Sequence, residues 1–213
     1  MNDQARYRRL YDRLAPVYGP ALNLLPMWRR YTEAALPWLP PSGAILEIGP
    51  GPGALHRTLA ARYAHTVALD LSPGMLAQAQ KRLRAAGLSS ELVRGNAVCL
   101  PFAAECFDGI VLTFAFSAIP DGAAAVAEMA RVLHPGGVIA LVDACDPENG
   151  NWVAHWLARL WERFGDFVRD EAALMRAAGL VIDEKREFGA FHSIRLTVGR
   201  KPSVQVGDSR RFA

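Results

Sequence analysis

The sequence of 213 residues contains little cysteine. Its cysteines, Cys99, Cys106 and Cys145, are odd in number, and no two of them form a Cys-x-x-Cys pair. This pattern argues against a disulfide framework and against a cysteine-ligated structural zinc site. The five histidines also lack the spacing of paired ligands, so we predict no metal centre. Low cysteine usage is typical of the reducing cytoplasm, where we expect the protein to reside.

Long apolar runs are also missing. The longest nearly apolar run, residues 110–119, is half of the roughly 20 residues that a membrane-spanning helix needs. The first residues, Met-Asn-Asp-Gln, lack the charged and then apolar layout of a signal peptide. We therefore expect neither a membrane-spanning helix nor export.

An excess of charge of one sign is missing from most of the chain. The net charge is +3, while 51% of the residues are hydrophobic and 21% are charged. This composition excludes a disordered chain and is typical of one globular α/β domain. Residues 1–30 hold six arginines against two aspartates, so the basic character lies at the N-terminus. The central region is mildly acidic, which argues against a nucleic-acid surface.

The basic N-terminal segment has the pattern of an amphipathic helix. Tyr7, Leu10, Tyr11 and Leu14 are spaced at i, i+3, i+4 and i+7, with arginines on the other side. One interpretation is a solvated arginine face on a helix that packs against the domain. The other is contact with an anionic membrane surface or an acidic ligand. We predict a helical lid over residues 1–40.

The rest of the chain alternates between predicted strands and helices. Strands are predicted at 44–49, 65–70, 90–95, 108–114, 138–142, 180–188 and 191–198, and helices at 54–63, 73–86 and 122–133. Apolar runs that are buried on both faces indicate a parallel sheet covered by helices. The short link Gly189-Ala190 allows only a hairpin, so the last strand should be antiparallel to the one before it. We predict one domain over 41–201 and a flexible tail over 202–213.

A glycine-rich loop and a following acid predict an adenosine-containing cofactor. Gly49–Ala54 fits the dinucleotide pattern G-x-G-x-x-G/A, and Asp70 ends the next strand, where a carboxylate can accept both ribose hydroxyls. Pro50 and Pro52 remove two backbone donors that would hold a pyrophosphate. Glu47 would repel a pyrophosphate but suits a ligand that carries an ammonium and a sulfonium.

Five ordered segments then resemble the class I S-adenosylmethionine-dependent methyltransferases, especially the ubiquinone/menaquinone C-methyltransferases and bacterial phospholipid N-methyltransferases. The segments are 47–53 (EIGPGPG), 69–76 (LDLSPGML), 95–102 (GNAVCLPF), 107–108 (FD) and 131–137 (RVLHPGG). The resemblance covers about residues 44–143 and implies a Rossmann-like three-layer sandwich with a seven-stranded sheet. It makes S-adenosylmethionine the expected cofactor.

The resemblance also assigns roles on the side of the sheet that would hold the adenosine. Asp70 would bind the ribose. Leu71 and Met75 would enclose the adenine, and Asn96 with Ala97 would contact its edge. These assignments follow from the family's motifs and not from the residues' chemistry alone.

At the methionine end, the resemblance places Gly49 and Gly51 beside the ligand, with Thr113 in contact with it and Phe114 beside the sulfonium. The segment 11–18 (YDRLAPVY) is similar to the family's N-terminal lid. This likeness adds Tyr11 to the cofactor-binding residues. It places Tyr18 near the methyl donor, where an aromatic ring suits a cation.

The histidines are the candidate general bases. Alignment and desolvation can supply most of the acceleration of methyl transfer, so a base is needed only for an acceptor that must lose a proton. His155 lies among Trp152, Trp156 and Trp161. We predict His155 as the catalytic base and Tyr18 as a second catalytic residue. His192 is a second candidate at the start of the last strand. The tryptophans indicate either a packed cover or an apolar roof over a hydrophobic acceptor.

The residues after the fourth predicted strand depart from the quinone enzymes. Those enzymes carry an Arg-Asn pair there, whereas Phe116–Pro120 has only Ser117 as a polar side chain. We predict methyl transfer to a small hydrophobic acceptor, such as a lipid, a quinone or a similar metabolite, with peripheral membrane contact through the N-terminal segment. The alternatives are a nicotinamide-dependent oxidoreductase and a non-catalytic S-adenosylmethionine-binding protein. The sequence does not determine the oligomeric state.

Overall fold

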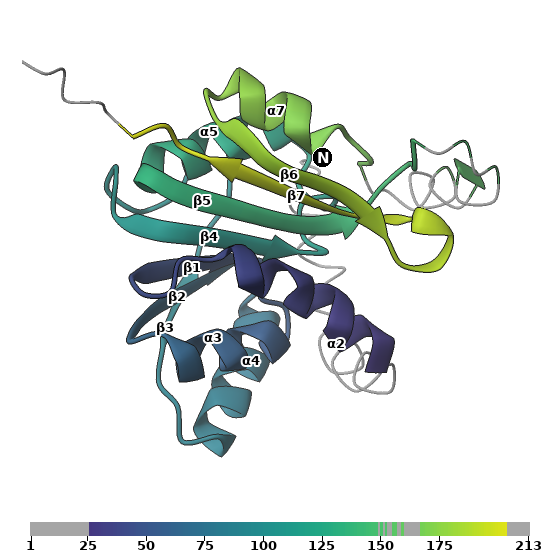
Figure 1. Cartoon of the computed structure of the whole chain (residues 1–213). Coiled ribbons are helices and arrows are strands. Elements are labelled where there is room, and N and C mark those ends of the chain that lie inside the picture. The colour runs from purple at the N-terminus through teal and green to yellow at the C-terminus, as the bar shows by residue number, and fades with distance from the viewer. Residues whose placement is uncertain are drawn as a thin grey trace, which may run out of the picture.

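The protein folds around one mixed sheet between two layers of helices (Figure 1). The computed structural model describes residues 26–148, 150, 152, 155, 156, 159 and 167–203. The strands are β1 (Ala44–Ile48), β2 (His65–Asp70), β3 (Glu91–Arg94), β4 (Phe107–Thr113), β5 (Leu133–Ala144), β6 (Val181–Phe188) and β7 (Ile194–Arg200). They form a seven-stranded sheet in the order β3-β2-β1-β4-β5-β7-β6.

The strand directions match those predicted. The pairs within β3-β2-β1-β4-β5 are all parallel. Strand β7 is antiparallel to both β5 and β6, so six strands point one way and β7 points the other. This topology confirms the Rossmann-like sandwich with an antiparallel last strand.

The helices cover both faces of this sheet. They are α2 (Pro26–Thr32), α3 (Ala54–Arg62), α4 (Pro73–Ala85), α5 (Gly122–Val132) and α7 (Glu171–Ala177), with the 3-10 helices η1 (Glu33–Trp38) and η2 (Ala190–His192). Figure 1 shows α5 and α7 on one face, and α2, α3 and α4 on the other. Helices α4, α5 and α7 begin at capping side chains, Ser72, Asp121 and Asp170, each of which accepts a backbone N–H of the first turn.

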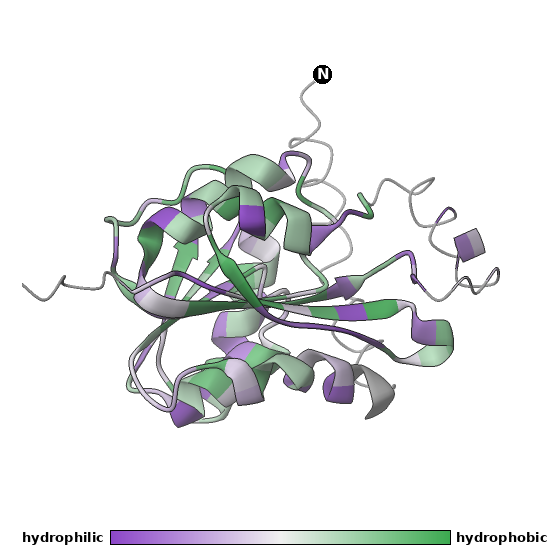
Figure 2. Ribbon diagram, turned by 45° about the horizontal axis from the view of Figure 1, so that its top comes forward, coloured by the Kyte–Doolittle hydropathy of each residue, from purple (hydrophilic) through white to green (hydrophobic). Residues whose placement is uncertain are grey.

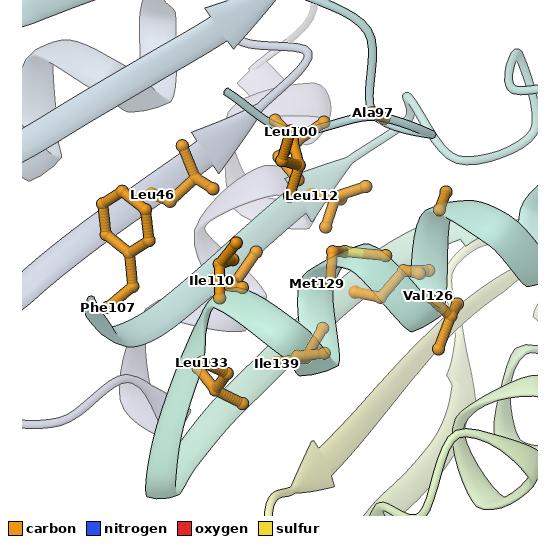
Figure 3. Packing of buried hydrophobic residues seen from close by; sticks show 14 of the residues in the cluster. Leu46, Ala97, Leu100, Phe107, Ile110, Leu112, Val126, Met129, Leu133 and Ile139 are labelled. Atoms are coloured by element: carbon orange, nitrogen blue, oxygen red, sulfur yellow. The ribbon is translucent and has the colours of Figure 1, made fainter. Parts of the chain in front are cut away.

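Alternate residues of the central strands fill two separate hydrophobic clusters. Toward α5 and α7, Ile110, Leu112 and Ile139 pack with Met129 (Figure 3). Toward α3 and η1, the intervening residues pack with buried side chains such as Leu59. The strands are therefore apolar throughout, whereas polar residues gather on the outer faces of the helices (Figure 2).

The residues just before β1 belong to the second cluster. Ala35 in η1 and Leu39 after it are buried, and the Tyr63 hydroxyl donates to the Pro40 carbonyl at 2.7 Å. The C-terminal part of the predicted 1–40 lid is therefore packed against the sheet. Residues 1–25 of that lid lie outside the described residues, as do residues 204–213 of the predicted tail.

Two strands start more than one residue away from their predicted starts. Strand β5 begins at Leu133 instead of Val138, because the Pro-Gly-Gly segment continues the strand across a register shift opposite Phe107 and Gly109. The β6–β7 connection is longer than expected, since β7 begins at Ile194. The prediction that His192 starts the last strand is therefore wrong. His192 ends η2 with a positive φ of 58°, a conformation that belongs to a turn.

Candidate functional site

The predicted cofactor residues come together at the carboxyl edge of the parallel strands. In the sheet register Ile48 lies opposite Leu69 on one side and Leu112 on the other. The glycine loop, Asp70 and Thr113 therefore follow these strands at one edge. Parallel α/β sheets bind ligands at this edge, where the strand order changes direction. Here that change falls at β1, between β2 and β4.

The three glycines of the loop have positive φ angles and different surroundings. A Cβ on Gly49 would lie 2.4 Å from Ala115 Cβ, so this glycine lets the loops after β1 and β4 approach each other. A Cβ on Gly53 would lie 2.8 Å from the Ala79 backbone, so it lets α4 approach. A Cβ on Gly51 would meet nothing within 4 Å. Among the three, Gly51 is the one whose bare backbone faces open space.

The loop has few backbone donors for a ligand, as the prolines predict. Gly49 N donates to the Leu69 carbonyl at 2.8 Å, and Gly53 N donates to the Pro50 carbonyl at 2.9 Å. Within the described part of the chain, Gly51 N–H has no such partner. Within residues 49–53, Gly51 N–H is thus the one backbone donor left for a ligand. Loops that cradle a pyrophosphate offer more donors, so this segment suits the methionine portion of S-adenosylmethionine better.

Asp70 and Asn96 lie at the ends of adjacent strands on the β2–β3 side. Gly95 N donates to the Asp70 carbonyl at 3.1 Å, which joins the two strand ends. Asp70 Oδ1 accepts Ser72 N at 2.8 Å, so the carboxylate is oriented by the turn that starts α4. Asn96 Oδ1 accepts Val98 N at 3.2 Å, which leaves the amide nitrogen as the side-chain donor. A carboxylate acceptor and an amide donor thus follow two adjacent strand ends.

The apolar residues assigned to the adenine differ in exposure. Leu71 is half-buried, whereas Met75 in α4 is buried. The Ala97 side chain packs in the hydrophobic cluster with Leu100 and Leu112, so its contribution to a ligand would be through its backbone. Of the three residues, Leu71 alone presents a partly exposed side chain.

Glu47 is placed differently from what its position in the motif indicated. Its carboxylate is buried, and Oε2 lies 2.9 Å from Nδ1 of the fully buried His56 on α3. His56 Nε2 lies 2.7 Å from the Ser90 hydroxyl, which also donates to the Thr66 carbonyl. Glu47 is thus the first member of a polar chain beneath the loop. The sequence analysis did not predict this pairing of Glu47 with His56.

The loop after β4 carries strain and a polar anchor. Phe114 has a positive φ of 52°, a backbone conformation that the Cβ of a non-glycine residue disfavours. Its N–H donates to the Val142 carbonyl at 2.8 Å. Ser117 donates through both its backbone N–H and its hydroxyl to the Asp143 carboxylate, at 2.8 and 2.9 Å. Ser117 therefore holds this loop against the end of β5.

A buried ionic cluster next to this anchor was not predicted. Arg195 on β7 is 4% exposed. Its guanidinium donates to Glu187 at 2.7 Å, to Glu171 at 3.3 Å and to the Asp146 carbonyl at 3.1 Å. Arg195 lies opposite Asp143 in the register. Two features of the sequence could have indicated this cluster. Asp143 lies near the end of the apolar strand β5, and the polar residues Arg195 and Thr197 alternate with apolar ones along β7.

Burial raises the pKa of Glu171 to about 7, and its backbone hydrogen bond and Arg195 oppose this shift. The carboxyl ordinarily titrates near pH 4.5, so the unfolded chain loses this proton at lower pH than the folded protein does. Its contribution to stability is fully present below about pH 4.5 and is lost as the pH rises through about 7.

We expect Glu171→Gln to remove this pH dependence, because glutamine has no proton to lose. From pH 4.5 to pH 8, the free energy of unfolding of the variant should rise by about 3 kcal/mol relative to that of the unchanged protein. Urea unfolding of both proteins at several pH values measures the difference. Parallel pH curves for the two proteins would contradict the prediction.

The predicted catalytic residues are only partly placed. Tyr11 and Tyr18 lie outside the described residues. The His155 side chain is 55% exposed, and its Nδ1 lies 2.9 Å from the Asp146 carboxylate. Trp152 and Trp156 are 78% and 60% exposed. These two tryptophans are therefore not packed into a core, whereas the environment of Trp161 lies outside the described residues.

The central part of the chain is similar to proteins of known class. Residues 46–141 match a methyltransferase domain family. A demethylmenaquinone methyltransferase from Mycobacterium sp. (strain KMS) is 37% identical over 145 residues, 66% of this chain and 60% of that protein. The ubiquinone/menaquinone biosynthesis C-methyltransferase UbiE of Syntrophotalea carbinolica is 34% identical, over 67% of this chain and 62% of that protein. The chain thus spans about 60% of the length of these relatives.

A solved structure shares the arrangement of strands and helices. The N-methyltransferase NodS from Bradyrhizobium japonicum WM9, in complex with S-adenosyl-l-homocysteine, matches with a TM-score of 0.75. The match covers 92% of this chain and 99% of that chain, at 20% sequence identity. Likeness at this level of identity establishes the fold alone.

Proposed function

The chain carries a methyltransferase domain of the S-adenosylmethionine-dependent class, and we propose that it transfers the methyl group to a small hydrophobic acceptor. The domain confirms the class predicted from the glycine loop, from Asp70 and from the ordered motifs. It favours this chemistry over the nicotinamide-dependent alternative.

The donor side of the site is proposed to consist of residues at the ends of β1, β2 and β3. Asp70 would bind the ribose hydroxyls, Asn96 would face the adenine, and Gly51 would lie along the methionine portion. When bound, S-adenosylmethionine supplies an electrophilic methyl group on a sulfonium, which is already a good leaving group. The protein would hold the acceptor in line with that methyl group and exclude water from it.

The proposed acceptor class rests on the hydrogen bonds that Ser117 makes within the protein. It is the only polar side chain in Phe116–Pro120, and Asp143 takes both its N–H and its hydroxyl. The Pro120 carbonyl in turn accepts Arg169 at 2.7 Å. The loop after β4 would therefore present mainly apolar groups to an acceptor, since its polar groups are already used. A hydrophobic molecule fits such a surface better than a sugar or an amino acid does.

Within this class we favour a quinol or a lipid. The relatives named above are quinone methyltransferases, which supports a quinol. The Arg-Asn pair that quinone enzymes carry after β4 is missing from this chain. The amine of a phospholipid is therefore a second candidate acceptor. Both acceptors lose a proton during methylation, and both are membrane components.

We also propose that residues 1–40 act as the lid and bring the protein to the membrane surface. The arginines of the N-terminal segment would attract anionic lipid, and the exposed Trp152 and Trp156 suit the interfacial region. No described helix is long and apolar enough to cross a membrane. Flotation with anionic liposomes at low salt should therefore recover the protein with the vesicles. Its absence from the floated fraction would count against membrane contact.

Labelling tests the acceptor. The chain is incubated with methyl-labelled S-adenosylmethionine and with fractionated cell extract. We expect label in the nonpolar quinone fraction or in the phospholipid fraction. Label in polar metabolites would overturn the hydrophobic class. If S-adenosylhomocysteine binds in calorimetry but no fraction acquires label, the result favours a non-catalytic binding protein.

A further inference from the structure

A histidine–carboxylate pair lies beyond the end of β5, on the side of the sheet away from the adenosine residues. His155 Nδ1 lies 2.9 Å from both oxygens of the Asp146 carboxylate. With Nδ1 held by the carboxylate, Nε2 is the ring nitrogen that is left to accept a proton. Among the described residues, no hydrogen bond reaches Nε2.

The carboxylate of this pair is mounted on the rigid end of the sheet. Asp146 follows Ala144, the last residue of β5, by two positions, and the intervening Cys145 N donates to the Ser193 carbonyl at 2.9 Å. The Asp146 carbonyl accepts the buried Arg195 guanidinium at 3.1 Å. Arg195 is itself held by Glu171 and Glu187. These bonds give Asp146 a defined position relative to the sheet.

The segment that carries His155 begins and ends beside the loop after β4. At its start, Asp143 accepts two hydrogen bonds from Ser117. At its end, Phe167 N donates to the Ser117 carbonyl at 2.8 Å. Asp146 is therefore attached next to the loop after β4, on the side of the sheet edge away from Asp70 and Asn96.

We propose that Asp146 and His155 form a proton-accepting dyad for the methyl acceptor, with His155 as the base and Asp146 as its positioning residue. This inference rests on the proposed function. The acceptor's O–H or N–H proton passes to His155 Nε2, and the electron pair of the resulting quinolate, through its ring carbon, or of the amine nitrogen forms the bond to the methyl carbon. On a ring carbon, the hydrogen of that carbon then leaves as a proton and the oxygen regains one, which restores the aromatic quinol. The sulfur–carbon bond breaks, and its electron pair stays on sulfur. His155 then returns the proton to water.

Several charged groups surround the dyad. Arg159 Nη2 lies 3.9 Å from Asp146 Oδ2. On the sheet side are Arg195 and Glu187, and next to them Glu148 pairs with Lys185. Arg159 shares Asp146 with His155 but cannot act as a base at neutral pH, so Arg159→Gln is the matched control.

The first test uses methyl transfer to a short-chain prenylated naphthoquinol that lacks the ring methyl, measured between pH 5 and 9. We expect His155→Gln to lower kcat roughly 100-fold, the usual contribution of a general base, and to remove the acid limb of the pH profile. Asp146→Asn should lower kcat roughly tenfold, and Arg159→Gln should leave the profile unchanged. If His155→Gln kept its kcat and pH profile, the pair would be only a latch, and the proposal would be overturned.

The second test is independent of turnover. Nitrogen-15 spectra of the full chain should show the neutral His155 with its proton on Nδ1, and Asp146→Asn should change that signature. A proton on Nε2 in the unchanged protein would overturn the dyad. Lack of turnover of the naphthoquinol by a chain with the expected tautomer would count against the quinol acceptor and would leave the dyad supported.

Discussion

Asp70→Ala is expected to weaken binding of S-adenosylhomocysteine roughly a thousandfold, since two hydrogen bonds to a charged group are each worth about 1.5–3 kcal/mol. The carboxylate lies at the end of β2, where Ser72 N orients it from a distance of 2.8 Å. No other acid among the described residues ends a strand on the β2–β3 side. Calorimetric titration of the variant with S-adenosylhomocysteine measures the loss.

Asp70→Asn is the matched control, because an amide oxygen can still accept Ser72 N and preserve the start of α4. We expect a loss of roughly tenfold, from the charge alone. The unfolding midpoints of both variants should stay close to that of the unchanged protein, because the side chain is only half-buried. Unchanged affinity in a folded Asp70→Ala protein would show that the ribose lies elsewhere.

Much of the donor side could be predicted because its determinants are local. The glycine loop, Asp70 and the capping residue Ser72 each act within a few residues of the chain, and the turn chemistry is legible in the sequence. The parallel sheet covered by helices followed from apolar runs that alternate with helices. The antiparallel last strand followed from the short connection after β6. These features depend on backbone conformation and hydrophobic pattern, which one sequence contains.

The β5–β7 side could not be predicted in the same way, because its groups meet only through strand pairing. Arg195 reaches Asp146 across 49 positions of sequence and Glu171 across 24. Alternation along β7 shows which residues share a face, but not which acids lie opposite. The same limit applied to Glu47, since its motif position could not reveal a histidine on the next helix. Long-range partners of buried polar groups require the fold.

The loop after β1 and the loop after β4 lie close together because of Gly49, next to the strained backbone of Phe114. Gly49 permits the loop after β1 to touch Ala115, the residue that follows the strained Phe114. A side chain at position 49 would push the two loops apart. The donor loop therefore lies against the loop that holds Ser117, and the Ser117 carbonyl in turn accepts Phe167 N. A proposed acceptor would contact a surface whose shape depends on this close approach.

His56→Leu is expected to destabilise the protein by about 3–5 kcal/mol, because it leaves the Glu47 carboxylate buried without its partner. His56 is 0% exposed and Glu47 is 1% exposed, so solvent cannot replace the lost contact. Ser90 keeps its bond to the Thr66 carbonyl at 2.7 Å, which limits the damage to the pair itself. Urea unfolding at neutral pH measures the change in the free energy of unfolding.

The double variant Glu47→Met/His56→Leu separates two roles of Glu47. Replacing both members of a buried pair by apolar residues is often neutral or stabilising, so most of the stability should return. A double variant that is as unstable as the sum of the single changes would disprove the pairing argument.

Calorimetry on the refolded double variant then shows whether Glu47 also contributes to ligand binding. Retained affinity for S-adenosylhomocysteine would mean that Glu47 only supports the loop. A loss of roughly tenfold or more would mean that its carboxylate also attracts the ligand's ammonium group.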